Sequence, residues 1–313
     1  MSVTVVVATY NRADLLSGTL AALASQEVSY GAKWEILVVD NNSQDQTKLV
    51  AESFARTTAV PLRYVFEPQQ GLSVARNRGV EEAGGSVIAF TDDDVLPPPD
   101  WVESVLKAFA KWDADGVGGR ILPLWQTLPP RWIMRDRHLL SRLALMDCDE
   151  SRVLTLPLGE QPQVWGANMA FRRELFSEIG MFDPGRGMKG KKLARGEEVD
   201  LIRRALERGS RIVYDPSIRV FHRIGRDRLR RRYFFKIEFD DAENETRYLP
   251  APAGRALFGA PYWTYRKAFT GFWRCLGYSI LRRPNAMSYQ LEWGSSLGRL
   301  SGYWRARRTR ATG

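Results

Sequence analysis

The chain has 313 residues, 44% of them hydrophobic, which predicts a folded globular protein and excludes a largely disordered one. Its formal charge is +10 and unevenly spread, because residues 201–313 hold 24 of the 46 basic but only 9 of the 36 acidic side chains. No run of about 18 uncharged apolar residues occurs, so the sequence predicts no membrane-spanning helix.

Strands and helices alternate through the first 95 residues. Short apolar runs predict strands at residues 3–8, 34–39, 62–66 and 87–90, with helical patterns between them. This order is typical of an α/β fold in which a mostly parallel sheet is flanked by helices. Ligands of such sheets bind at the carboxyl ends of the strands, where polar residues follow three of the four runs. We interpret residues 1–95 as a nucleotide-binding half.

Beyond residue 95 the patterns are less regular. They predict helices at 101–112 and 197–208, strands at 164–171 and 211–214, a glycine- and lysine-rich mobile loop at 185–196, and no clear element over 123–162. The composition changes sharply after His222, which places a domain boundary near Gly225. Residues 96–225 then form an acceptor half, and residues 226–313 a basic, largely helical extension.

Three adjacent carboxylates, Asp92, Asp93 and Asp94, follow the fourth predicted strand. Like charges this close repel one another, so the cluster favours a compensating cation. Hard carboxylate oxygens bind Mg²⁺ or Mn²⁺, which in turn bridge substrate phosphates. A solvated acidic turn or a helix N-cap is the alternative interpretation.

Seven short motifs stand in one order along the chain, and together they resemble glycosyltransferase family 2. They are VVATYNR (6–12), VVDNNS (38–43), GLSVARN (71–77), DDD (92–94), GAN (166–168), GEEVDL (196–201) and His222. Each motif alone is weak, but their order over residues 1 to about 225 is specific. The resemblance implies a GT-A, Rossmann-like fold and inverting transfer of a sugar from a nucleoside-diphosphate sugar to a hydroxyl group.

The resemblance also implies a set of nucleotide-sugar-binding residues. These are Thr9, Tyr10, Asn11, Asp40, Arg76, Asp92 and Asp93. Asp40 is expected to accept a hydrogen bond from the base, and Arg76 to lie near the base or a phosphate; an exposed helix arginine is the alternative. Asp40 and Arg76 favour a UDP-sugar, with guanosine and thymidine donors left open.

The same resemblance implies a metal site that takes Mn²⁺ or Mg²⁺. Asp94 is expected to bind the ion directly, with Asp92 and His222 as further ligands. A neutral imidazole is a suitable Mn²⁺ ligand beside carboxylates. A purely structural histidine is the alternative.

An inverting transfer needs a carboxylate that deprotonates the incoming hydroxyl. The resemblance assigns this role to Glu198, with Glu197 as the alternative, because family members often have Glu-Asp where this chain has two glutamates. Both acids could instead only favour the N-terminus of a helix. On the acceptor side the resemblance implies Asn168 and Trp165, and a structural role for Asn168 stays open.

Aromatic and basic residues alternate through residues 226–313. Helices of this composition lie in a lipid interface, with rings inserted and cations at the headgroups. The opening residues lack a basic leader, and Cys148 and Cys275 match no disulfide framework, so we expect a cytoplasmic protein bound peripherally to the inner face of the plasma membrane. The acceptor is then a glycan or a polyprenyl- or lipid-linked sugar of cell-surface polysaccharide or glycolipid synthesis. Packing on the catalytic domain, or an oligomer contact, is the alternative for this extension.

Three rival functions were weighed. A nucleotidyltransferase shares an acidic metal site but needs a glycine-rich phosphate loop after the first strand, and this chain has none there. Nucleic-acid binding is suggested by the pI of about 9.7, yet no reading motif is present. A catalytically inactive scaffold is disfavoured by the intact Asp cluster and Glu198.

Overall fold

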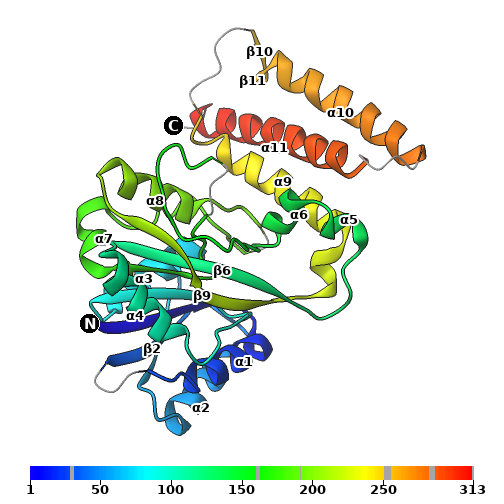
Figure 1. Cartoon of the computed structure of the whole chain (residues 1–313). Coiled ribbons are helices and arrows are strands. Elements are labelled where there is room, and N and C mark those ends of the chain that lie inside the picture. Colours follow the sequence, from blue (N-terminus) through cyan, green and yellow to red (C-terminus); the bar gives the residue numbers. More distant parts are fainter. Residues whose placement is uncertain (29–31, 160–162, 191, 250–254, 282–285, 312–313) are drawn as a thin grey trace. The chain divides into compact units, whose positions relative to one another are not determined.

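Figure 1 shows a computed structural model of the chain, which describes residues 1–28, 32–159, 163–190, 192–249, 255–281 and 286–311. Contacts within the chain divide it into two compact units. The first unit contains Met1–Gly190 and Gly196–Gly225, and the second contains Lys191–Arg195 and Arg226–Gly313. The predicted loop at 185–196 is thus shared between the units, and its residue 191 lies outside the described part.

The first unit is built on a nine-stranded sheet in the order β3-β2-β1-β4-β8-β6-β9-β5, with β7 beside β9. Its strands are β1 (Ser2–Thr9), β2 (Lys33–Asp40), β3 (Leu62–Phe66), β4 (Val87–Asp92), β5 (Val95–Leu96), β6 (Gly116–Trp125), β7 (Arg152–Val153), β8 (Met169–Arg172) and β9 (Ile212–Ile224). The first four strands are parallel to one another, and β8 runs antiparallel to β4 and β6.

Helices flank this sheet, as Figure 1 shows. They are α1 (Ala13–Ala24), α2 (Thr47–Thr57), α3 (Leu72–Glu82), α4 (Trp101–Trp112), α5 (Arg131–Met134), α6 (Arg137–Arg142), α7 (Arg173–Ile179) and α8 (Glu197–Glu207). Val5, Val6 and Val7 are all buried although successive strand residues point to opposite faces. Both faces of the central strands are therefore covered, which confirms the predicted α/β class.

The structure differs from the sequence prediction at two strands. The strand predicted at 164–171 begins only at Met169, because residues 165–168 form a turn closed by a hydrogen bond from Asn168 N to Trp165 O (2.9 Å). The strand β6 was not predicted, since its glycines hide the alternation. Gly119 in β6 lies at a register shift opposite β9, where a Cβ atom would come within 2.0 Å of the Ile218 carbonyl oxygen. Only glycine allows this close approach.

The second unit is largely helical, as predicted. After a 3-10 turn (Arg226–Leu229) it contains α9 (Arg231–Glu245), a short hairpin of β10 (Ala256–Leu257) and β11 (Ala260–Pro261), α10 (Tyr262–Ile280) and α11 (Ala286–Ala311). Aromatic contacts join its helices: the ring of Trp293 on α11 lies 5.5 Å from Phe235 on α9 and 5.4 Å from Phe272 on α10. Across the described residues, no helix combines the length and apolarity needed to cross a bilayer.

Candidate active site

The carboxyl ends of β1, β2 and β4 meet at one edge of the sheet. In the parallel registers Thr9 lies opposite Asp40, and Ala8 lies opposite Asp92. Hydrogen bonds then tie the loops together. The Thr9 hydroxyl donates to Asp93 (2.8 Å), and the side-chain oxygen of Asn11 accepts from the backbone N–H of Gln44 (2.7 Å). The structure therefore brings together the predicted nucleotide-binding residues of the first two strand ends.

Asp40 is buried and held from two sides. Its carboxylate accepts hydrogen bonds from the Tyr64 hydroxyl (2.8 Å) and from the backbone N–H of Ser43 (2.9 Å). Burial and the nearby Asp40 carboxylate raise the pKa of Tyr64, so this hydroxyl stays a donor. Tyr10 is half-buried and Asn11 is exposed at the same edge. The arrangement fixes the orientation of the Asp40 carboxylate while Tyr10 and Asn11 face solvent.

The Asp cluster contains an internal counter-charge. Arg12 Nη1 donates to Asp93 Oδ1 (2.9 Å) and to Asp94 Oδ2 (3.0 Å), and both carboxylates are buried. Burial raises the pKa of Asp93 to about 6, against the lowering effect of Arg12. The charge of Asp93 in turn raises the pKa of Arg12. The sequence alone assigned no role to Arg12. Its position three residues after the end of β1 was the one indication that it could reach the strand-end carboxylates.

His222 meets one of the predicted metal ligands. It lies in β9, pairs with Val95 of β5, and places Nε2 3.3 Å from Asp94 Oδ1, with both side chains buried. Asp92 instead pairs with Arg76: the distance from Asp92 Oδ1 to Arg76 Nη2 is 3.4 Å. Nowhere in the described ranges are three or more His, Cys, Asp or Glu side chains placed to hold a metal ion. The donor types of Asp94 and His222 suit Mn²⁺ or Mg²⁺, and these two side chains lie together at the end of β4.

Arg76 joins the Asp cluster to the acids of α8. Its Nη1 donates to Glu197 Oε1 (2.6 Å), and its guanidinium is 3% exposed. Burial alone would lower the pKa of Arg76, but the charges of Glu197 and Asp92 raise it, so the group stays cationic. An exposed helix arginine is therefore excluded. Arg76 links Asp92 at the end of β4 with Glu197 at the start of α8.

Glu197 and Glu198 occupy different environments. Glu197 is buried and paired with Arg76, whereas Glu198 is half-buried at the first turn of α8. Gly196 precedes them with a φ of +102°, a left-handed conformation that glycine adopts without strain. The N-terminus of α8 also favours carboxylates over neutral acids. Of the two glutamates, Glu198 is the less buried, although its Oε2 atom is itself buried.

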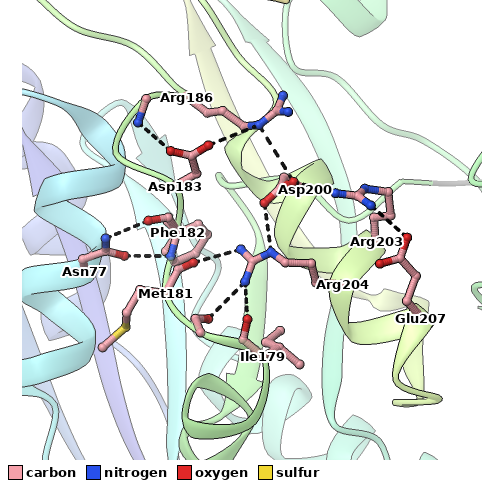
Figure 2. A network of polar contacts seen from close by, with 12 residues as sticks. Asn77, Ile179, Met181, Phe182, Asp183, Arg186, Asp200, Arg203, Arg204 and Glu207 are labelled. Carbon is pink, nitrogen blue, oxygen red and sulfur yellow. Dashed lines mark hydrogen bonds and ion pairs between the residues drawn. The ribbon is translucent and has the colours of Figure 1, made fainter. Parts of the chain in front are cut away.

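A polar network fixes α8 relative to α3, and sequence reasoning missed it (Figure 2). Asn77 on α3 pairs with both backbone groups of Phe182, at 2.8 and 2.9 Å. Arg204 on α8 donates to the carbonyls of Ile179 and Met181, and its Nε donates to Asp200 (2.9 Å). The spacing of Asp200 and Arg204, one helical turn apart, was a weak signal. Since α3 carries Arg76 and α8 carries Glu197, this network holds the buried ion pair in place.

The two predicted acceptor-side residues are placed differently. Both N–H groups of the Asn168 amide donate to backbone carbonyls, of Arg120 (2.9 Å) and Ile218 (3.0 Å), and its oxygen accepts from Trp101 Nε1 (2.8 Å). Asn168 is buried, so these bonds favour the structural role that was left open. Trp165 is half-buried in the turn before it.

We expect Gly166→Ala to destabilise the protein. A Cβ atom at this position would lie 2.1 Å from Arg76 Nη2, and Arg76 cannot move freely because it is buried and paired with Glu197. Overpacking of this kind costs about 1–3 kcal/mol in the free energy of unfolding, measurable by urea denaturation. The exposed Gly84 is the matched control, since an added Cβ there meets Glu35 at an ordinary 3.4 Å. Equal stability of the two variants would contradict the prediction.

Comparisons with known proteins agree with this geometry. The sequence model of the family "Glycosyl transferase family 2" matches residues 4–180, which is more than half of the chain. The chain is 30% identical over 244 residues to the glucosyl-dolichyl phosphate glucuronosyltransferase of Haloferax volcanii, covering 77% of this chain and 72% of that protein. It is 26% identical to the succinoglycan biosynthesis protein ExoM of Rhizobium meliloti, covering 79% and 75%.

Solved structures show the same fold. The mannosyltransferase PcManGT of Pyrobaculum calidifontis, in complex with GDP-Man and Mn²⁺, superposes with a TM-score of 0.61 at 19% identity, covering 97% of this chain and 87% of that one. TarS of S. aureus in complex with UDP-GlcNAc superposes with a TM-score of 0.56 at 16% identity, covering 98% and 92%. The chain therefore belongs to glycosyltransferase family 2: it has the GT-A fold and is a glycosyltransferase that uses a nucleotide-sugar donor.

Proposed function

We propose that the protein is an inverting glycosyltransferase that transfers a sugar from a nucleoside-diphosphate sugar to a hydroxyl of a glycan or a polyprenyl- or lipid-linked acceptor. The observation that carries this proposal is the bridge through Arg76, which bonds Asp92 of the strand-end cluster and Glu197 at the start of α8. This bridge holds the donor-side carboxylates and the start of α8, which carries the candidate base Glu198, in one arrangement. A displacement between two bound substrates requires such fixed positions.

The reaction is a direct displacement at the anomeric carbon. A bond forms from the acceptor oxygen to this carbon while the bond to the diphosphate oxygen breaks, which inverts the configuration. The hydroxyl proton passes to the carboxylate of Glu198, which is half-buried at the first turn of α8. Glu197 is engaged by Arg76, so its role is to hold this part of α8 and to neutralise a buried cation.

The donor side is formed by the ends of β1, β2 and β4. Thr9, Tyr10 and Asn11 line the nucleotide site, and the oriented Asp40 carboxylate accepts a hydrogen bond from a base N–H. Uracil and guanine both carry such a group; a UDP-sugar is favoured. Two structural neighbours are complexes with UDP-GlcNAc and with GDP-Man, which supports a sugar-nucleotide donor.

Asp94 and His222 are the residues that would hold a divalent ion, with Asp92 nearby at the same strand end. Bound Mn²⁺ or Mg²⁺ would neutralise charge on the departing diphosphate. The solved mannosyltransferase of Pyrobaculum calidifontis contains Mn²⁺, which supports this assignment. The protein's own part is to keep the two ligands buried and together.

A donor screen tests the proposal. The protein is heated with UDP-, GDP- and TDP-sugars in the presence and absence of Mn²⁺, and nucleoside-diphosphate release is measured for each donor. One class of sugar nucleotide should raise the melting temperature, more so with Mn²⁺, and should be turned over. If no donor shifts the melting temperature or releases diphosphate, the proposed function is wrong.

The names of two relatives and the composition of the second unit support the proposed acceptor. One relative is named for a dolichyl phosphate-linked sugar and another for succinoglycan biosynthesis, which supports synthesis of a lipid-linked glycan or cell-surface polysaccharide. We place this activity at the cytoplasmic face of the plasma membrane, with the protein attached peripherally through its second unit. Trp165 stays the predicted acceptor-side residue on the catalytic unit.

The exposed side of α10 carries the membrane contact in this proposal. Its Thr264 and Ala268 are buried, whereas an exposed stripe at helical spacing faces the other way: Phe269, Trp273, Leu276 and Ile280. Ile280 is 70% and Phe269 66% exposed. No acidic residue occurs between Glu245 and Glu292, while the same stretch has seven Lys and Arg residues. Exposed rings with cations around them fit an anionic bilayer surface.

We expect the double variant Phe269→Ser/Trp273→Ser to bind anionic vesicles at least about tenfold more weakly than the unchanged protein, since burying one such ring contributes about 1.5–3 kcal/mol. Co-sedimentation with phosphatidylglycerol-containing vesicles at low salt measures this. Leu49→Ser is the control, because Leu49 is also exposed (62%) but lies on α2. Unchanged binding of the double variant, or no preference for anionic over neutral lipid, would contradict the membrane assignment.

A further inference from the structure

The segment just before α8 is held by the acidic side of α9. We use this name for Asp240, Asp241 and Glu243, three carboxylates near the carboxyl end of that helix. Arg195 binds Asp241 three times: its backbone N–H donates at 2.9 Å, its Nε at 3.1 Å and its Nη2 at 2.7 Å. The backbone N–H of Leu193 donates to Asp240 at 2.8 Å. Backbone as well as side-chain groups of the segment 192–195 are therefore fixed.

The acidic side of α9 is a hydrogen-bonded cluster in which Asp241 is half-buried and the other two carboxylates are buried. Asp240 and Glu243 are 5% and 2% exposed. Glu243 accepts hydrogen bonds from Lys192 and from the Ser301 hydroxyl (2.6 Å). Burial would raise the pKa of Glu243, but the bonds from Lys192 and Ser301 bring the pKa below its usual range, so the group is charged. Charge-assisted bonds in a buried cluster are strong and directional, so the cluster can hold a segment in one position.

Two left-handed glycines flank the held segment. Gly190 has a φ of +59° and Gly196 a φ of +102°, and they stand where the chain leaves and re-enters the first unit. Glu197 and Glu198 follow Gly196 directly. Only two residues separate Arg195 from Glu198, and consecutive Cα atoms are about 3.8 Å apart, so a shift of Arg195 is passed on to the start of α8.

We propose that Asp241 is a positioning residue for the transfer reaction: through Arg195 it sets where α8 begins, and so where the Glu198 carboxylate lies. This inference rests on the proposed function of Glu198 as the base. Its consequence is that the second unit controls turnover, while donor binding depends on strand ends of the first unit. A contact that only stabilised the fold would affect both equally.

The test compares Asp241→Asn with Glu207→Gln, which removes the charge from an exposed ion pair with Arg203 on α8. In Asp241→Asn we expect kcat, for the donor selected by the screen above, to fall about 10–100-fold, as misplacement of a catalytic group by a fraction of an ångström does. Affinity for UDP with Mn²⁺ should stay within about twofold, and Glu207→Gln should change neither. Amide hydrogen exchange over residues 193–198 should be faster in Asp241→Asn alone.

A charge exchange separates positioning from stability. Asp241→Arg combined with Arg195→Asp restores the ion pair in reverse and should recover part of the lost kcat, whereas Asp241→Arg alone should not. If Asp241→Asn does not fold, Arg195→Gln replaces it, because this variant removes the side-chain part of the same contact. The same changes in kcat, UDP affinity and amide exchange are expected for it. Unchanged kcat and exchange in a folded variant, or equal loss of UDP binding and turnover, would overturn the inference.

The outcome is separable from that of the proposed function. If Glu198→Gln loses turnover but Asp241→Asn keeps it, the base stands and the positioning role of Asp241 is wrong. If Glu198→Gln keeps full turnover, the base assignment is wrong, and with it the stated purpose of this contact.

Discussion

Replacing Glu198 by Gln is expected to abolish sugar transfer while donor binding is retained. The amide has the shape of the carboxylate but cannot take the proton of the acceptor hydroxyl, and loss of a general base costs about 10²–10⁴-fold in turnover. Glu198 is half-buried at the first turn of α8, and the buried Arg76 keeps its ion pairs with Glu197 and Asp92 in this variant. Steady-state turnover and the donor-induced rise in melting temperature measure the two effects separately.

Glu197→Gln is the matched control for this prediction. It removes the partner of the buried Arg76, and breaking a buried ion pair from one side costs about 3–5 kcal/mol in the free energy of unfolding. We therefore expect low stability for Glu197→Gln and near-normal stability for Glu198→Gln. Normal turnover by a folded Glu198→Gln protein would rule out Glu198 as the base.

Asp94→Asn should remove the dependence of donor binding on Mn²⁺. Asp94 is buried against His222, and an amide is a far weaker ligand for a hard cation than a carboxylate. At a concentration one hundred times the dissociation constant, a ligand adds about 2.7 kcal/mol to stability, so the lost shift is large enough to measure. Turnover should fall at least about a hundredfold, because charge stabilisation of a leaving group contributes several kcal/mol.

Thermal melting with UDP, titrated with Mn²⁺, reads out this effect directly. The control is Asp113→Asn, because the Asp113 side chain is 96% exposed, away from the cluster, and pairs only with a surface arginine among the residues described. If Mn²⁺ still raises the melting temperature of Asp94→Asn, but no longer raises that of a variant at another residue, the metal site is at that other residue.

The first half of the fold follows from the sequence because its signals are local. Each of the first four strands is a short apolar run, and parallel strands bring their carboxyl ends to one edge. Asp40 and Asp92 accordingly end the two strands, β2 and β4, that flank β1. Among the later strands, β8 and β9 overlap predicted strands at 164–171 and 211–214, whereas β6 was not predicted. β6 contains Gly116, Gly118 and Gly119, whose missing side chains remove the alternation from which a strand is recognised.

The sequence indicated which residues belong to the candidate site, but not which of them bond to one another. The chain order gives no sign that Arg76 bonds Glu197, 121 positions later, or that Arg12 bonds Asp93 and Asp94. Such long-range ion pairs depend on the folded topology. The contact between residues 192–195 and α9 could not be predicted for the same reason. The lysine and arginine of this segment suggested a mobile loop, but the acidic residues that bind them lie some 46 residues further along the chain.

The bond of Arg12 to two neighbouring carboxylates has a consequence for how the enzyme is made. The cationic side chain of Arg12 partly offsets the negative charge of this strand end as soon as the chain folds. We therefore expect the protein to fold without added manganese or magnesium, so that, under the proposed metal assignment, scarcity of the ion would lower the rate of sugar transfer rather than the amount of folded protein.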